Sequence, residues 1–62
     1  MKKGKGIRKM KSKRILIITK DFQEFSYTAA RLQFSNGFIF VFDKNNEYIA
    51  TFEQDGTEIY FE

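Results

Sequence analysis

Eight cationic side chains are crowded into the first fourteen residues of the chain, which contain no acid. Lysine and arginine neutralise phosphates and release counterions, so this block predicts sequence-independent, strongly salt-dependent binding to DNA or RNA. The alternatives are a solubilising arm, or an arm that folds onto an acidic surface of its own chain or a neighbour's. The candidate phosphate-binding residues are Lys2, Lys3, Lys5, Arg8, Lys9, Lys11, Lys13 and Arg14.

The remainder of the chain has the opposite charge. Residues 15–62 hold three cations and all eight acids, a net charge of −5, although the whole chain is at +3. Glycines and a serine interrupt the basic block, and it shows no apolar periodicity that would support burial. We therefore predict a flexible basic arm at residues 1–12 and a single small β domain at residues 13–62.

A second group of residues offers aromatic ring faces. Phe38, Phe40 and Phe42 alternate in "NGFIFVFD", so a strand would place them on one side of a sheet. Such a face can stack single-stranded bases. A core layer or a dimer interface is favoured, because exposed apolar patches of this size are uncommon on monomers and several acids border this one. The candidate interface or partner residues are Arg31, Phe38, Phe40, Phe42, Tyr48, Phe52 and Tyr60.

The composition excludes most catalytic and metal chemistry. The chain has no Cys and no His, hence no disulfide, thiolate, imidazole ligand or usual neutral-pH general base. The segment "DKNNE" is too short for a twelve-residue calcium loop. The carboxylate pairs Asp21/Glu24 and Asp55/Glu58 lack an evident cleft. We predict that the protein is not an enzyme and binds no cofactor or metal.

Turn signals position the aromatic residues on hairpins. "SNGF" contains the Asn-Gly pair of a two-residue type I′ turn, and "DKNNE" and "EQDGT" suit loops that end with left-handed Asn46 and Gly56. These turns predict the strand pairs Leu32–Val41, Phe34–Ile39, Val41–Ile49, Phe42–Tyr48, Phe38–Phe52, Thr51–Ile59 and Ile49–Phe61. Face A, with Leu32, Phe34, Ile39, Val41, Ile49, Thr51, Ile59 and Phe61, is then the core, and Phe38, Phe40, Phe42, Tyr48, Ala50, Phe52 and Tyr60 share the opposite face.

Residues 21–35 support two interpretations. Phe22, Phe25, Ala29 and Leu32 have helical spacing, and Asp21 with Glu24 has the form of a capping box. The aromatic and β-branched residues of "FSYT", followed by alternation into face A, favour a strand instead. A strand is the preferred interpretation.

The sequence thus predicts an all-β fold, a small antiparallel β-meander of four to five strands behind the basic arm. The alternative is an α+β fold with one helix at about 22–34 on a three- to four-stranded sheet. We expect a non-enzymatic nucleic-acid-associated accessory or regulatory protein whose sheet forms a homodimer. The alternative is an inhibitor or adaptor, phage or mobile-element encoded, that presents its aromatic face or acidic loops to a protein. With no Cys and no apolar run longer than "ILII", we expect a soluble, cytoplasmic protein without membrane contact.

Overall fold

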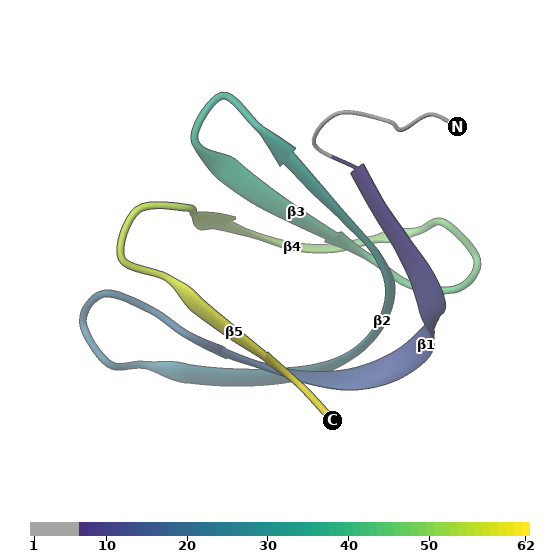
Figure 1. Ribbon diagram of the computed structural model, residues 1–62, viewed down its shortest axis with the longest axis horizontal. Coiled ribbons are helices and arrows are strands. Elements are labelled where there is room, and N and C mark those ends of the chain that lie inside the picture. Colours follow the sequence, from purple (N-terminus) through teal and green to yellow (C-terminus); the bar gives the residue numbers. More distant parts are fainter. Residues whose placement is uncertain (1–6) are drawn as a thin grey trace.

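The computed structural model describes the backbone of residues 7–62 and the side chains of residues 11–62. Five antiparallel strands form one sheet in the order β4-β3-β2-β1-β5, and residues 7–62 contain no helix (Figure 1). The strands are β1 (Ile7–Ile18), β2 (Glu24–Ser35), β3 (Phe38–Phe42), β4 (Tyr48–Glu53) and β5 (Glu58–Phe61). The predicted all-β fold class is confirmed. The alternative helix at 22–34 is wrong, because β2 is extended throughout.

β1 begins earlier than the sequence predicts. Its backbone pairs with β2 from Ile7, which lies opposite Gln33, whereas the predicted flexible arm extends to residue 12. Pairing with the edge of β2 provides partners for backbone amide and carbonyl groups, and this offsets the entropy of ordering a polar segment. Residues 1–6 of the predicted arm lie outside the described residues.

β2 is strongly curved, so both of its ends contribute to one core (Figure 1). Its inward-facing residues are odd-numbered up to Ala29 and even-numbered from Leu32 onward. At this change from odd to even positions, which we call the step, residues 10–12 of β1 lie opposite a single β2 residue, Ala30. Bulges of this kind bend a strand and increase its twist. The step also explains why apolar residues in this segment mimic helical spacing.

The predicted turn residues adopt the predicted backbone. Asn36 and Gly37 have φ angles of 53° and 82°, as a type I′ turn requires. Asn46 and Gly56 are also left-handed, with φ angles of 63° and 79°. The β2–β3 register is the predicted one, with the pairs Leu32–Val41 and Phe34–Ile39.

β4 contains a bulge that changes which residues face the core. Val41 lies opposite Ala50, and Ile49 is the extra residue before this pair. Beyond the bulge the register is displaced by one residue, so Phe52 faces inward and Thr51 faces outward, the reverse of the prediction. The predicted pair Phe42–Tyr48 is confirmed, whereas Val41–Ile49 and Phe38–Phe52 are wrong.

β5 does not continue the meander. It lies at the other edge of the sheet beside β1, where Ile59 pairs with Ile17 (Figure 1). The backbone N–H of Gln54 donates to the carbonyl of Gly37 at 2.8 Å, which ties the start of the β4–β5 loop to the β2–β3 turn. Pairing with β1 provides hydrogen-bond partners for a strand edge that a β4–β5 hairpin would leave open. The predicted pairs Thr51–Ile59 and Ile49–Phe61 are therefore wrong.

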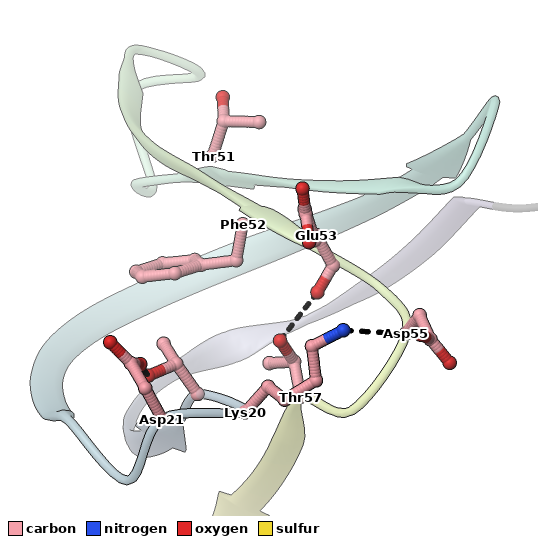
Figure 2. Close-up of a pocket in the computed structure, with 8 residues that line it drawn as sticks. Lys20, Asp21, Thr51, Phe52, Glu53, Asp55 and Thr57 are labelled. Atoms are coloured by element: carbon pink, nitrogen blue, oxygen red, sulfur yellow. Dashed lines mark hydrogen bonds and ion pairs between the residues drawn. The ribbon is translucent and has the colours of Figure 1, made fainter.

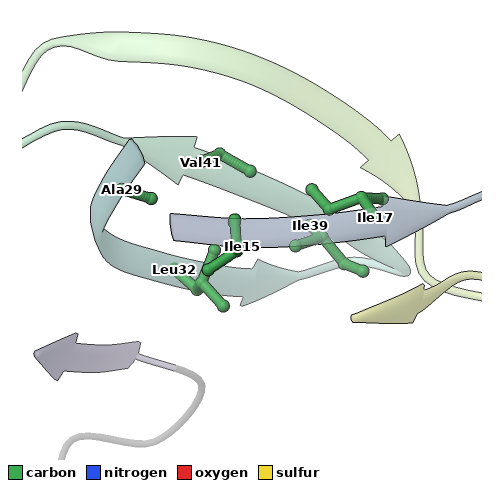
Figure 3. Close-up of a cluster of buried hydrophobic side chains, with 6 residues drawn as sticks. All are labelled: Ile15, Ile17, Ala29, Leu32, Ile39 and Val41. Atoms are coloured by element: carbon green, nitrogen blue, oxygen red, sulfur yellow. The ribbon is translucent and has the colours of Figure 1, made fainter. Parts of the chain in front are cut away.

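The core lies on the inner face of this curved sheet (Figure 3). Its buried side chains are Ile15, Ile17, Ala29, Leu32, Ile39 and Val41. β4 and β5 complete the core with the half-buried residues Ile49, Phe52 and Ile59. The predicted core positions Leu32, Ile39 and Val41 are confirmed, and each buried aliphatic side chain stabilises the fold by about 1.5–3 kcal/mol.

Candidate nucleic-acid interface

Aromatic side chains cover the outer face of β3, on the side of the sheet opposite the core. Phe38, Phe40 and Phe42 alternate with the buried residues of this strand. Because opposed residues share a face, Phe42 has Arg31 of β2 on one side and Tyr48 of β4 on the other. Phe38 and Tyr48 are 42% and 60% exposed, while Phe40 and Phe42 are half-buried. We call these five residues the outer aromatic face.

Arg31 lies over the ring of Phe42. Its guanidinium carbon lies 3.8 Å from the centre of the Phe42 ring, a cation–π distance. Its Nε donates to Oδ1 of Asn46 at 2.9 Å, and its Nη1 donates to Oε1 of Gln33 at 3.0 Å. Guanidinium donors lie in the plane of the group, so these bonds fix its orientation without covering that plane.

Tyr48 is fixed at the other end of the same cross-strand row. Its ring centre is 6.2 Å from that of Phe42, and the two rings meet edge to face at 71°. Its hydroxyl shares a 2.6 Å hydrogen bond with Oγ1 of Thr51. Arg31, Phe42 and Tyr48 therefore form one continuous, pre-ordered row across three strands.

The cationic segment reaches this row at Lys9, because residues 7–14 belong to β1. Arg8 and Lys9 are both paired with β2, and Lys9 lies directly opposite Arg31 in the register. Lys11, Lys13 and Arg14 are exposed. The predicted phosphate-binding residues Lys2, Lys3 and Lys5 lie outside the described residues.

Two predicted interface residues do not belong to the outer aromatic face. Phe52 is part of the core, with its ring centre 5.3 Å from that of Phe25 and 6.2 Å from that of Tyr27. Tyr60 lies on β5, at the far edge of the sheet. The Glu58 carboxylate accepts a 2.6 Å hydrogen bond from the Tyr60 hydroxyl and places negative charge beside it, which raises the pKa of Tyr60 above its usual 10.0.

A shallow depression of about 380 Å³ lies between the β1–β2 loop and the end of β4 (Figure 2). It is lined by Thr19, Lys20, Asp21, Thr51, Phe52, Glu53, Asp55 and Thr57. Lys20 and Asp55 form a 3.6 Å ion pair, but both side chains are largely exposed, so the pair adds little stability. No group of three metal-ligating side chains occurs within the described part of the chain. Within the depression the Thr19 hydroxyl donates a hydrogen bond to Oδ1 of Asp21.

Sequence reasoning missed the residue that orients Arg31. Asn46 is predicted as a turn residue, and its left-handed backbone is that of the prediction, but its side chain also accepts the hydrogen bond from Arg31. The available signal was that the second turn follows directly after Phe42 and leads into Tyr48. An amide in that turn is therefore close to the same row.

Among residues 7–62 no helix has the length and apolar character of a membrane span. No family model matches the chain, and neither a curated protein nor a solved structure is significantly similar to it.

Proposed function

We propose that this is a non-enzymatic, nucleic-acid-associated accessory protein that contacts phosphates through its basic N-terminal segment. The observation that carries the proposal is the pairing of this segment with β2, which places Lys9 opposite Arg31. A strand holds its cations at fixed spacing, so fewer conformations are lost on binding than for a free arm. The Cys-free composition suits a cytoplasmic site of action.

The uneven charge distribution supports phosphate binding over a general solubilising role. Exposed Lys11, Lys13 and Arg14 lie on β1, whereas the acids lie after residue 20. If all eight cations contacted a single strand, log K would fall against log salt with a slope of about −5 to −6. Acidic loops elsewhere on the domain repel phosphate, and this repulsion directs a bound strand to β1.

Two charge-matched variants test the proposal in the full-length chain. Lys11→Gln with Lys13→Gln removes two exposed cations from β1, and Lys20→Gln with Lys44→Gln removes two exposed cations elsewhere. Fluorescence anisotropy with labelled single-stranded and duplex oligonucleotides, from about 50 to 200 mM salt, measures the slope. We expect the β1 variant to reduce the slope by about one unit or more and the control to leave it unchanged. Equal effects of the two variants, or no binding at low salt, would contradict the proposal.

Self-association through the sheet is a second element of the proposal. β4 and β5 are the edge strands, and an edge strand presents backbone groups that can pair with a second copy. Sedimentation velocity across a concentration series tests this element. A monomer at high micromolar concentration would contradict it and leave phosphate binding intact.

A protein-binding role is the second candidate function, and Phe22 is the observation in its favour. This side chain is 85% exposed at the tip of the β1–β2 loop, with a left-handed φ of 66°. The loop is ordered by hydrogen bonds from the Thr19 N–H to the Gln23 carbonyl and from the Phe22 N–H to the Thr19 carbonyl, both 2.9 Å. An exposed aromatic anchor on an ordered loop is typical of binding hot spots. If cellular activity survives the β1 double variant and is lost with Phe22→Ala, this candidate is favoured.

A further inference from the structure

Phosphate contact leaves the outer aromatic face unexplained. Phe38 and Tyr48 are large side chains that expose much of their surface to solvent. Neither contributes to the core, which lies on the other side of β3 and β4. A small domain gains no stability from exposing these rings, and an exposed apolar patch marks an interaction site.

We propose that the outer aromatic face stacks the bases of a single-stranded nucleic acid whose phosphates lie along β1. This inference rests on the proposed function and specifies its substrate as single-stranded. Stacking on aromatic rings needs unpaired bases and tolerates any sequence, because every base has a π face. A duplex offers phosphates but buries its base faces, so it would use β1 alone.

Across the sheet, cationic residues are followed by aromatic residues, which is the order of the phosphate and the base in one nucleotide. Moving across the sheet from β1, the register passes from Lys9 to Arg31, then to Phe42 and Tyr48. Adjacent strands are about 4.8 Å apart, so the aromatic strand β3 is roughly 10 Å from the cationic strand β1. This separation is similar to the distance from a phosphate to the far side of its base.

Arg31 lies on β2, between the cationic strand β1 and the aromatic strand β3. Its guanidinium already lies on one face of Phe42, and Asn46 and Gln33 hold it in that plane. Arginine stacks on bases as well as on aromatic rings. A base placed over Arg31 would extend an existing stack, and the positive charge would remain near the phosphates on β1.

The acids near the face determine which side of the sheet the phosphates of the bound strand occupy. Asp43 is occupied within its own turn, because Oδ1 accepts the backbone N–H groups of Asn45 and Glu47 at 2.8 and 3.0 Å. Glu47 and Glu53 are exposed at the two ends of β4. They repel phosphates from the β4 side, so the sugar–phosphate backbone is directed to β1 and the bases to β3.

The exposed aromatic area favours a base over a second copy of the chain. With about 200 Å² per aromatic side chain, Phe38 and Tyr48 together expose roughly 200 Å². The half-buried Phe40 and Phe42 raise the total to at most about 350 Å², whereas a stable dimer buries about 800 Å² on each partner. A patch of this size accommodates one or two nucleobases.

The test compares variants that keep apolar bulk but remove the ring. Phe38→Leu with Tyr48→Leu is the test variant, and Phe38→Tyr with Tyr48→Phe is the matched control that retains both rings. Anisotropy is measured with labelled oligothymidine and with a duplex of equal length, and melting curves check the fold. We expect the Leu variant to lose about tenfold or more in affinity for the single strand, with duplex affinity unchanged. The control should bind like the wild type.

A fluorescence measurement tests the contact directly. The chain has no Trp, so Tyr48→Trp introduces a single reporter. We expect its emission to be quenched by oligothymidine and not by inorganic polyphosphate, which carries phosphates without bases. Equal single-strand affinity in the Leu variant and the wild type, with no quenching, would overturn the inference. Steep salt dependence in that case would leave the proposed function standing. A wild-type dimer that the Leu variant converts to a monomer would also overturn it, because a second copy would then occupy the face.

Discussion

Replacing Phe52 with alanine tests the β4 bulge, on which the assignment of inner and outer faces depends. In the structure its ring packs against Phe25 and Tyr27 on the inner face, with ring centres 5.3 and 6.2 Å apart. Without the bulge, Phe52 would lie beside Phe38 on the outer face and neither ring would be core. The substitution therefore distinguishes two registers that share the same turns and strands.

The expected loss for Phe52→Ala is about 2–3 kcal/mol. Deleting a fully buried Phe costs about 3–5 kcal/mol, and Phe52 is half-buried, so the expected loss falls below that range. The two aromatic contacts account for about 1 kcal/mol of the loss. A domain of this size has a total stability on the order of 5 kcal/mol, so the variant would remain folded at low temperature with little margin.

Urea unfolding monitored by circular dichroism measures this loss, with Phe38→Ala as the matched control. Phe38 is the same residue type on the adjacent strand but lies on the outer face and is 42% exposed. With a urea dependence of about 1 kcal/mol per molar, Phe52→Ala should lower the midpoint by roughly 2 M, and the control should lower it by less than about 1 M. Similar losses for the two variants would refute the bulged register.

Three further outcomes follow from the structure. Val41→Asp should abolish cooperative thermal unfolding, since Val41 is fully buried and an unpaired carboxylate there costs several kcal/mol. Gly56→Ala should destabilise the fold more than Gly37→Ala in chemical denaturation. Both glycines have positive φ, but an added Cβ meets a lysine side chain at 2.9 Å only at Gly56. Equal losses of stability for the two variants would count against this loop packing. The raised pKa of Tyr60 means that folding stabilises its neutral form. The resulting contribution to folding stability is complete below pH 10 and is lost as the pH rises through the folded-state pKa. Ultraviolet titration of Glu58→Gln should show that pKa move back towards 10.0, and an unchanged titration would exclude the carboxylate as its cause.

Sequence reasoning succeeded where the physical signal is local. The Asn36-Gly37 turn has no good alternative to a type I′ hairpin, and it determined the β2–β3 register correctly. That register placed Leu32 and Val41 in the core and Arg31 next to Phe42. The part of the candidate site that lies on β2 and β3 could therefore be predicted.

The incorrect predictions concern contacts that no local pattern determines. A bulge adds one residue without a sequence signal of its own, and at Ile49 it reversed the predicted faces of Thr51 and Phe52. The partner of β5 depends on which strand edge is open after the other four strands have paired. The sequence shows a turn before β5 but not the identity of that edge.

The pairing of β5 with β1 has a consequence for the time course of folding. The residues of the Ile15–Phe61 pair are roughly 45 positions apart, so closing that contact directly costs about 2 kcal/mol more in chain entropy than closing a tight hairpin. During synthesis from the N-terminus, β1 to β4 can form their hairpins in order while one edge of β1 stays unpaired until residues 58–61 emerge. We infer that a nascent chain exposes the apolar edge of β1 at residues 15–18 for most of its synthesis. The high contact order of this last step predicts folding slower than that of a plain meander of equal length.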